Sequence, residues 1–140
     1  QNTMKNNKGF SLIEILVVVA IIGIISATAI KITINNIDLA KRKSAEIVMQ
    51  KIILGQTEYY SSEGIYFTTS KSSACVPNSL DSSNIESELF GGDNVITDEI
   101  GYEMCVANDL SNFKIFATNG KCKITLNSLN VITRKGCNLV

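Results

Sequence analysis

The sequence predicts an α+β fold, in which one long N-terminal α-helix is followed by a globular head with three or four antiparallel strands. Two observations support this prediction. An apolar run from Phe10 to Ile30 continues into an amphipathic pattern with helical spacing. Near the C-terminus, Asn119-Gly120 separates two alternating segments, which is a strong hairpin signal. The 140 residues show no internal repeat, and their number indicates one domain.

The predicted helix begins with a hydrophobic segment, residues 10–34. It is long enough to cross a bilayer, because a spanning helix needs roughly 20 apolar residues. Its one acid, Glu14, lies near the start. An acid in the middle of a membrane span costs about 3 kcal/mol, and less toward the ends. We therefore expect a positive partner for Glu14.

The position of the small residue Gly9 indicates where the chain is cut. An ordinary secretory signal has its small-residue cleavage site after the apolar core, whereas Gly9 precedes it and follows a basic stretch. Cleavage between Gly9 and Phe10 removes a leader, residues 1–9, with Met4 as its expected start. The apolar helix stays, and Phe10 gains a free amine one helical turn from Glu14. This positive amine, or that of a neighbouring chain, offsets the charge of Glu14.

The N-terminal residues resemble the type IV pilins and the related pseudopilins. The resemblance is close over about residues 5–30 and loose beyond, and it is carried by Gly9, Phe10, Ser11, Leu12, Ile13 and Glu14, followed by the apolar run Val17–Ile30. It implies the pilin fold. It also implies that a membrane prepilin peptidase cuts after Gly9 and methylates the Phe10 amine. In the assembled filament, Glu14 would set the axial register through the Phe10 amine of a neighbour.

Helical signals continue past the membrane segment. One face carries apolar residues, namely Ile34, Ile37, Ala45, Val48, Ile52 and Tyr59. The other faces carry most of the charge and are expected in solvent, with Asp38, Lys41, Arg42, Lys43, Glu46 and Lys51. We expect one helix from about Phe10 to about Ser61, with Gly64 as its C-cap. Its first half would be transmembrane, and its second half would pack on the head, residues 35–140.

The head is expected to consist of a loop followed by a sheet. Residues 62–98 are rich in Ser, Asn, Gly and Asp and contain Pro77, so they are predicted to be a loop. The tyrosines near the helix exit are expected to pack in the core and the turn. Strands are expected at residues 100–107, 113–118, 121–126 and 130–134.

Four cysteines lie in the C-terminal half: Cys75, Cys105, Cys122 and Cys137. An even number in a domain outside the cytoplasm predicts two disulfides, and the residues alone leave three connectivities open. A zinc site is disfavoured, because the sequence has no C-x-x-C pair and no histidine. We expect the pairs Cys75–Cys105 and Cys122–Cys137. The second pair closes a short C-terminal loop, as in many type IV pilins.

Charge is unevenly distributed although the net charge is zero. Residues 72–112 contain eight acids and no base, and residues 113–140 contain five bases and no acid. The simpler interpretation is two solvated faces that pack against each other or against neighbouring subunits. The alternative is a basic patch for an anionic partner such as DNA, formed by Lys121, Lys123, Arg134 and Lys135. A calcium loop at Asp93, Asn94, Asp98 and Glu99 is a further alternative, although its spacing does not match an EF-hand.

The sequence favours a structural protein over an enzyme. It has no histidine for a nucleophile pair and no glycine-rich phosphate loop, and we expect no cofactor and no metal. The resemblance implies a type IV pilus subunit that polymerises through its N-terminal helix after leader removal, for adhesion, motility or DNA uptake. Its partners would be copies of itself, prepilin peptidase and the inner-membrane assembly machinery. The precursor would lie in the bacterial inner membrane and the mature subunit in an extracellular filament.

Three alternatives remain open. The chain could be a pseudopilin of a type II secretion system, or a minor competence pilin that captures DNA. It could also be a signal-anchored membrane protein with no role in assembly.

Overall fold

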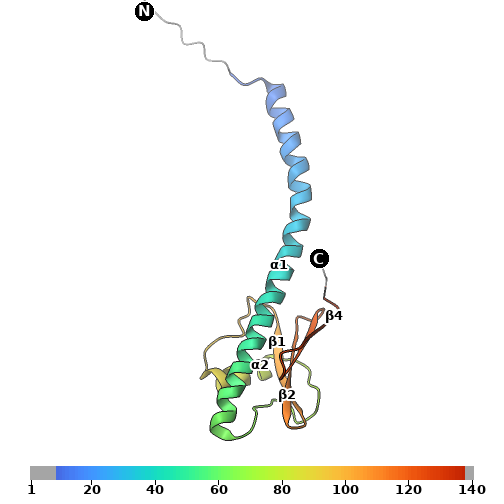
Figure 1. Cartoon of the computed structure of the whole chain (residues 1–140). Helices are drawn as coiled ribbons and strands as arrows, with labels where there is room; N and C mark the ends of the chain where they lie inside the picture. Colours follow the sequence, from blue (N-terminus) through green and yellow to red (C-terminus); the bar gives the residue numbers. More distant parts are fainter. Residues whose placement is uncertain (1–8, 138–140) are drawn as a thin grey trace, which may run out of the picture. The chain divides into compact units, whose positions relative to one another are not determined.

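The computed structural model describes the backbone of residues 9–137 and the side chains of residues 9–29 and 33–137. Helix α1, Leu12–Glu63, is the longest element (Figure 1). The chain forms two units, one up to Ile37 and one from Asp38 onward, and each is described by itself. The predicted leader, residues 1–9, lies outside the described residues except for Gly9.

The N-terminal unit is a bare apolar helix. Its large hydrophobic side chains between Leu12 and Ile25 are exposed, from 79% at Leu12 to 52% at Ile21. By length and composition, α1 is the one helix among the described residues that could cross a membrane. Ile34 and Ile37 were expected on a packed face, but they are 54% and 48% exposed. That expectation is wrong for these two side chains, which belong to the N-terminal unit.

The C-terminal end of α1 follows the predicted cap. The helix ends at Glu63, two residues later than expected, and Gly64 has φ = 74°. The Gly64 N–H donates to the Tyr60 carbonyl oxygen at 2.9 Å. Glycine adopts this left-handed conformation without the steric cost of a Cβ, so the prediction of Gly64 as the C-cap is confirmed.

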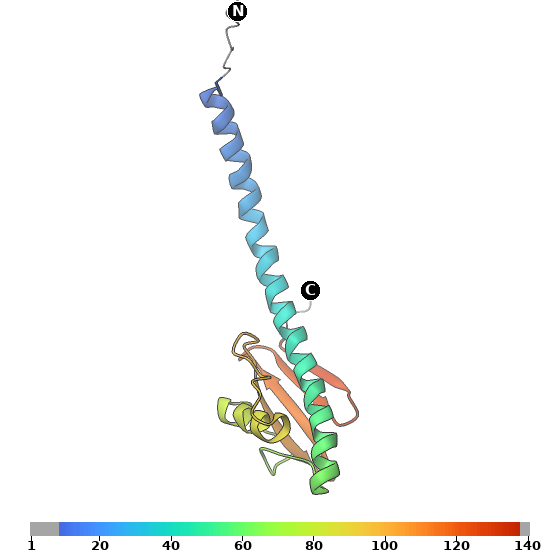
Figure 2. The same cartoon turned by 90° about the vertical axis from the view of Figure 1, so that its left-hand side faces the viewer.

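The second unit contains one antiparallel sheet of four strands. The strands are β1 (Glu103–Asp109), β2 (Asn112–Thr118), β3 (Lys123–Asn127) and β4 (Ile132–Lys135). They lie in the order β1-β2-β3-β4, so each pairs with its sequence neighbour (Figures 1 and 2). The α+β prediction of a long N-terminal helix and a four-stranded antiparallel head is confirmed.

The β2–β3 hairpin forms where Asn119-Gly120 predicts it, but its turn is longer than two residues. The Asn119 side-chain oxygen accepts from the N–H groups of Lys121 and Cys122, at 3.0 and 2.8 Å. Gly120 has φ = 94°. Because Asn119 draws Lys121 and Cys122 into the turn, β3 begins at Lys123 rather than at Lys121.

The head has one hydrophobic core between the sheet and the second half of α1. From α1 come Ala45, Val48, Met49 and Ile52, each at most 5% exposed. Alternate residues of the strands face them, because successive strand residues point to opposite faces. These are Met104, Val106, Phe113, Ile115, Ala117, Ile124 and Leu126. The other sheet face is the outer face of the head, except along β1, where its residues Cys105 and Ala107 are buried.

Residues 62–98 are not one loop, and this prediction is wrong. They contain helix α2, Ser79–Phe90. The Asn78 side chain caps its start by accepting from the Asp81 N–H at 2.8 Å, and Gly91 ends it in the left-handed conformation. Both signals are present in the sequence, but the serine-rich composition obscured them. Helix α2 packs on α1 at Gly55, where an added Cβ would lie 3.2 Å from the Leu89 Cβ.

The outer edge of β1 is covered by the chain that precedes α2. Thr69 and Ser70 donate backbone N–H groups to the Val106 carbonyl oxygen, at 2.8 and 3.1 Å. Ser82 of α2 accepts from the Met104 N–H at 2.9 Å. A disulfide joins Cys75 of this segment to Cys105 of β1, and a second joins Cys122 to Cys137. These pairs coincide with the expected ones.

A buried glutamine holds the chain as it leaves α1. Gln56 is fully buried, donates to the Phe67 carbonyl oxygen at 2.6 Å and accepts from the Phe67 N–H at 2.8 Å. The neighbouring tyrosines pack as expected, since the Tyr66 ring lies 4.9 Å from that of Phe113. The Gln56 amide thus satisfies both backbone hydrogen-bonding groups of Phe67, as a neighbouring strand would.

We predict that Gln56→Ala lowers the free energy of unfolding of the head by about 2 kcal/mol. The substitution leaves the Phe67 N–H and carbonyl oxygen without their side-chain partner. Thermal unfolding of the full chain in detergent, followed by the near-ultraviolet tyrosine signal, would measure this. Gln50→Ala is the control, since Gln50 is exposed on the same helix. Equal stability of the two variants would contradict the assigned role of Gln56.

Candidate functional site

The predicted cleavage bond precedes the first turn of α1. Gly9 and Phe10 lie outside the helix, both are exposed, and the Phe10 side chain is 83% exposed. A Cβ added at Gly9 would meet nothing within 4 Å. Among the described residues, packing therefore places no limit on the size of residue 9, and both residues of the predicted cleavage bond are exposed.

Glu14 has a hydrogen-bond partner in its own chain. Its Oε2 accepts from the Ser11 N–H at 2.9 Å, and the Ser11 carbonyl oxygen accepts from the Glu14 N–H at 3.0 Å. Ser-x-x-Glu at a helix start is the sequence signature of a capping box, in which the glutamate satisfies the N–H of the capping residue. This capping role was not among those predicted for Glu14 from the sequence. Ser11 also explains why α1 begins at Leu12 rather than at Phe10.

The surroundings of Glu14 are apolar. A shallow hollow of about 330 Å³ is lined by Phe10, Ile13, Glu14, Val17 and Val18. The carboxylate lies within the first turn of α1, where the helix dipole favours negative charge. A positive group brought to this apolar surface would therefore find one acceptor, already held in place by the Ser11 N–H.

The strand alternation divides the predicted basic patch between two faces. Lys123 pairs with Lys135, and Ile124 pairs with Arg134. Ile124 is buried in the core, so Arg134 lies on the α1 side of the sheet, and the two lysines lie on the outer face. The adjacent Lys121 is exposed in the β2–β3 turn. The structure therefore gathers three of the four bases and separates the fourth.

Arg134 forms an ion pair with Glu46 of α1 through its Nε and the Glu46 Oε1. Glu46 and Arg42 were expected in solvent, but they are 6% and 7% exposed, so this expectation is wrong. The physical reason is charge pairing, since Arg42 and Lys43 also lie within 4.0 Å and 3.8 Å of the Glu46 carboxylate. The hydrogen bond from Arg134 lowers the pKa of Glu46, and the nearby positive charges add to this despite burial.

We predict that acid weakens the head through Glu46. Because its pKa is lower in the folded chain than the ordinary 4.5, its stabilising contribution is complete above pH 4.5 and is lost as pH falls through the folded pKa. Glu46→Gln should lower the free energy of unfolding by about 2 kcal/mol at pH 7 and by much less at pH 3. Unfolding at both pH values measures this, with Glu58→Gln as the exposed control on α1. A pH-independent deficit would contradict the prediction.

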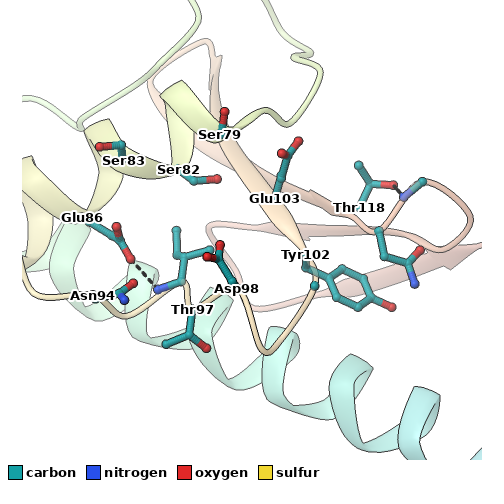
Figure 3. A pocket seen from close by; sticks show the side chains of 14 residues that line it. Ser79, Ser82, Ser83, Glu86, Asn94, Thr97, Asp98, Tyr102, Glu103 and Thr118 are labelled. Atoms are coloured by element: carbon teal, nitrogen blue, oxygen red, sulfur yellow. Dashed lines mark hydrogen bonds between the residues drawn. The ribbon is translucent and has the colours of Figure 1, made fainter.

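A polar hollow of about 590 Å³ lies between α2, the loop before β1 and the β2–β3 turn (Figure 3). Glu86, Asp98 and Glu103 line it, but Glu86 accepts from the Ile96 N–H at 2.7 Å. Tyr102 borders it, and burial raises the pKa of this phenol. Within residues 9–137, no three histidine, cysteine or acidic residues are placed to hold a metal ion.

The comparison with protein families gives one finding. The model of the prokaryotic N-terminal methylation motif matches residues 4–30. The chain carries a type IV prepilin-like signal motif. The match includes Gly9, Phe10 and Glu14, which are the residues that carry the resemblance in the sequence. Searches of curated proteins and of solved structures returned no significant match to the chain.

The prepilin-like motif and the fold together support a secreted subunit of the type IV pilin or pseudopilin kind. The motif implies processing by a prepilin peptidase and assembly into a pilus-like polymer. With the apolar part of α1, it fits a membrane-anchored precursor. Motif and fold suggest a structural subunit rather than an enzyme.

Proposed function

We propose that the chain is a structural subunit of a type IV pilus, which polymerises through α1 after its leader is removed at Gly9. The observation that carries the proposal is the exposed apolar side chains of the helix from Leu12 to Ile25, with Ile34 and Ile37. Apolar surface of this extent is stable only in lipid or against other apolar surface. Transfer of α1 from the membrane into a bundle of like helices keeps that surface out of water.

The geometry at Glu14 supports the same proposal. Cleavage before Phe10 creates an amine next to the hollow in which Glu14 lies. In a helix bundle, the amine of one copy meets the carboxylate of another, and each neutralises a charge that is costly in an apolar medium. Outside this bundle, the head faces an oxidising compartment, which suits the two disulfides.

The experiment is purification of the protein from its host, followed by N-terminal mass analysis and electron microscopy of the cells. We expect a chain that begins at a methylated Phe10, and surface filaments that disappear when the gene is deleted. A mature chain that keeps the leader would contradict processing and favour a simple signal anchor. Processing without surface filaments would favour a pseudopilin.

We predict that a larger residue at position 9 blocks leader removal. Gly9→Val should leave most of the chain unprocessed in the membrane, and Gly9→Ala should slow processing. Because a Cβ at Gly9 meets nothing within 4 Å, neither change disturbs the chain itself, and any loss reflects recognition by the peptidase. Immunoblots of precursor and mature forms measure this. Complete processing of Gly9→Val would exclude cleavage at Gly9.

A further inference from the structure

A row of side chains crosses the outer face of the sheet and changes sign from one edge to the other. The pairing register places Glu103 opposite Thr118, Thr118 opposite Lys123, and Lys123 opposite Lys135. Residues that pair directly lie on the same face of a sheet. The row therefore carries a negative charge at β1 and two positive charges at β3 and β4. Three strand spacings separate its ends by about 14 Å.

The positive end of the row is unbalanced. Lys123 and Lys135 face each other across β3 and β4 and are both exposed, and like charges in this position are destabilising. The exposed Lys121 lies two residues before Lys123, and its backbone adjoins Gly136, because its carbonyl oxygen lies 2.6 Å from where a Gly136 Cβ would be. The Cys122–Cys137 disulfide holds the two segments together. Among residues 9–137, no ion pair joins these lysines to a carboxylate.

The negative end of the row lies at the other side of the head. Glu103 is exposed at the start of β1, and Asp98, which is also exposed, lines the same hollow (Figure 3). Neither has an ion-pair partner among the described residues. The positive end at β4 and the negative end at β1 are thus two different surfaces of one chain, each complementary to the other in charge.

We propose that the Lys123–Lys135 edge of one copy of this chain binds the Asp98–Glu103 edge of the next copy. This rests on the proposed function, because it assigns a head contact within the polymer. Two different surfaces that bind each other make a heterologous contact, and such contacts repeat along an open helical filament. The incoming carboxylates relieve the repulsion between Lys123 and Lys135. The charge pattern also fixes which edge meets which, as complementary charges do at protein interfaces.

A second copy fits this surface better than a polyanion does. Arg134, the fourth base expected in a DNA-binding patch, is engaged by Glu46 on the opposite face. The lysines share their face with Glu103, which repels phosphate. The whole chain has a net charge of zero, whereas the electrostatic footprint of nucleic-acid binders is basic.

Charge reversal in two separate chains tests the proposal. One full-length chain carries Lys123→Glu and Lys135→Glu, and a second carries Asp98→Lys and Glu103→Lys. Each is expressed alone, both are expressed together, and one chain carries all four changes. Sheared filaments are measured by immunoblot and electron microscopy. The control is a chain with Lys71→Glu, Ser72→Glu and Ser73→Glu. It changes the net charge as much as the two lysine reversals do, at exposed positions outside the row.

We expect each reversed chain alone to yield at least about tenfold fewer filaments, since like charges then meet at the contact. Co-expression and the fourfold reversal should both restore filaments, and the control should assemble normally. Membrane amounts and disulfide formation show that the chains fold. Restoration by a second chain is the decisive result, because a purely internal role of these charges cannot be rescued from outside.

Other outcomes overturn the inference without touching the proposed function. Normal filaments from both reversed chains would exclude the contact. If two well-folded reversed chains form no filaments when they are expressed together, these charges act within one chain and not between copies. Loss of DNA retention with intact filaments would assign the lysines to an anionic ligand. If the wild-type chain forms no filaments at all, the proposed function itself falls, and the inference falls with it.

Discussion

Chains carrying Glu14→Ala should enter the membrane at wild-type levels and form no filaments. The substitution removes the carboxylate that lies in the apolar hollow beside Phe10. Loss of one partner of a buried charge pair costs about 2–5 kcal/mol, which is at least about 30-fold in each association step. Because the contact repeats at every subunit, the effect on a polymer is all or none. Membrane fractionation and electron microscopy measure the two outcomes separately.

Glu14→Gln separates the helix cap that Glu14 forms in the structure from its proposed pairing with the Phe10 amine. The amide oxygen can still accept from the Ser11 N–H, as the Glu14 Oε2 does at 2.9 Å, but it carries no charge. If the charge sets the register, Gln fails to assemble, as Ala does. If Gln assembles normally and Ala does not, the helix cap is the function of Glu14, and the proposed pairing with the Phe10 amine is wrong.

Removal of the Cys75–Cys105 disulfide should destabilise the head more than any other single deletion of a contact. The two residues are 30 positions apart, and a closed loop of this length contributes about 3–4 kcal/mol. Cys105 is also fully buried, so Cys75→Ala with Cys105→Ala leaves a small cavity. The combined loss of about 4 kcal/mol should lower the unfolding temperature by more than about 15 °C.

The matched control is Cys122→Ala with Cys137→Ala. This disulfide spans 15 positions, and its loss should cost about 3 kcal/mol. Thermal unfolding of the full chain in detergent, followed by the near-ultraviolet tyrosine signal, compares the two variants. A larger effect of the Cys122–Cys137 deletion would show that the segment before α2 is not anchored through Cys75.

The sequence was most predictive where one local pattern decides the structure. The apolar run fixes the N-terminal half of α1, Gly64 fixes its end, and Asn119-Gly120 fixes the hairpin. Helix α2 was missed because its composition is that of a loop, although Asn78 and Gly91 provide both caps. In this segment, cap residues carried more information than average polarity did.

Contacts between distant residues could not be predicted in the same way. Glu46 and Arg134 are 88 positions apart, and helical spacing alone places Glu46 in solvent. The Glu46 carboxylate can be buried because Arg134 of β4 forms an ion pair with it. The same strand alternation removes Arg134 from the expected basic patch and leaves Lys123 and Lys135 on the outer face. Like charges that are neighbours in the sequence are therefore placed on opposite faces of the sheet, because successive strand residues alternate between the faces.

At the predicted cleavage site, the sequence indicated candidate residues but not their local geometry. Gly9, Phe10 and Glu14 were read from the resemblance, and the family comparison supports that motif. The hydrogen bond between Glu14 and Ser11 follows from a general helix-start pattern, which is independent of any family.

The covering of β1 protects this protein against aggregation at high local concentration. An unpaired sheet edge recruits strands from other molecules and starts aggregates. Thr69 and Ser70 occupy that edge on β1, and the Cys75–Cys105 bond fastens them there. The remaining edge, β4, is four residues long and ends in Arg134 and Lys135. Neither edge therefore favours strand pairing between copies at high local concentration. Reduction of the Cys75–Cys105 disulfide would release the segment that covers β1.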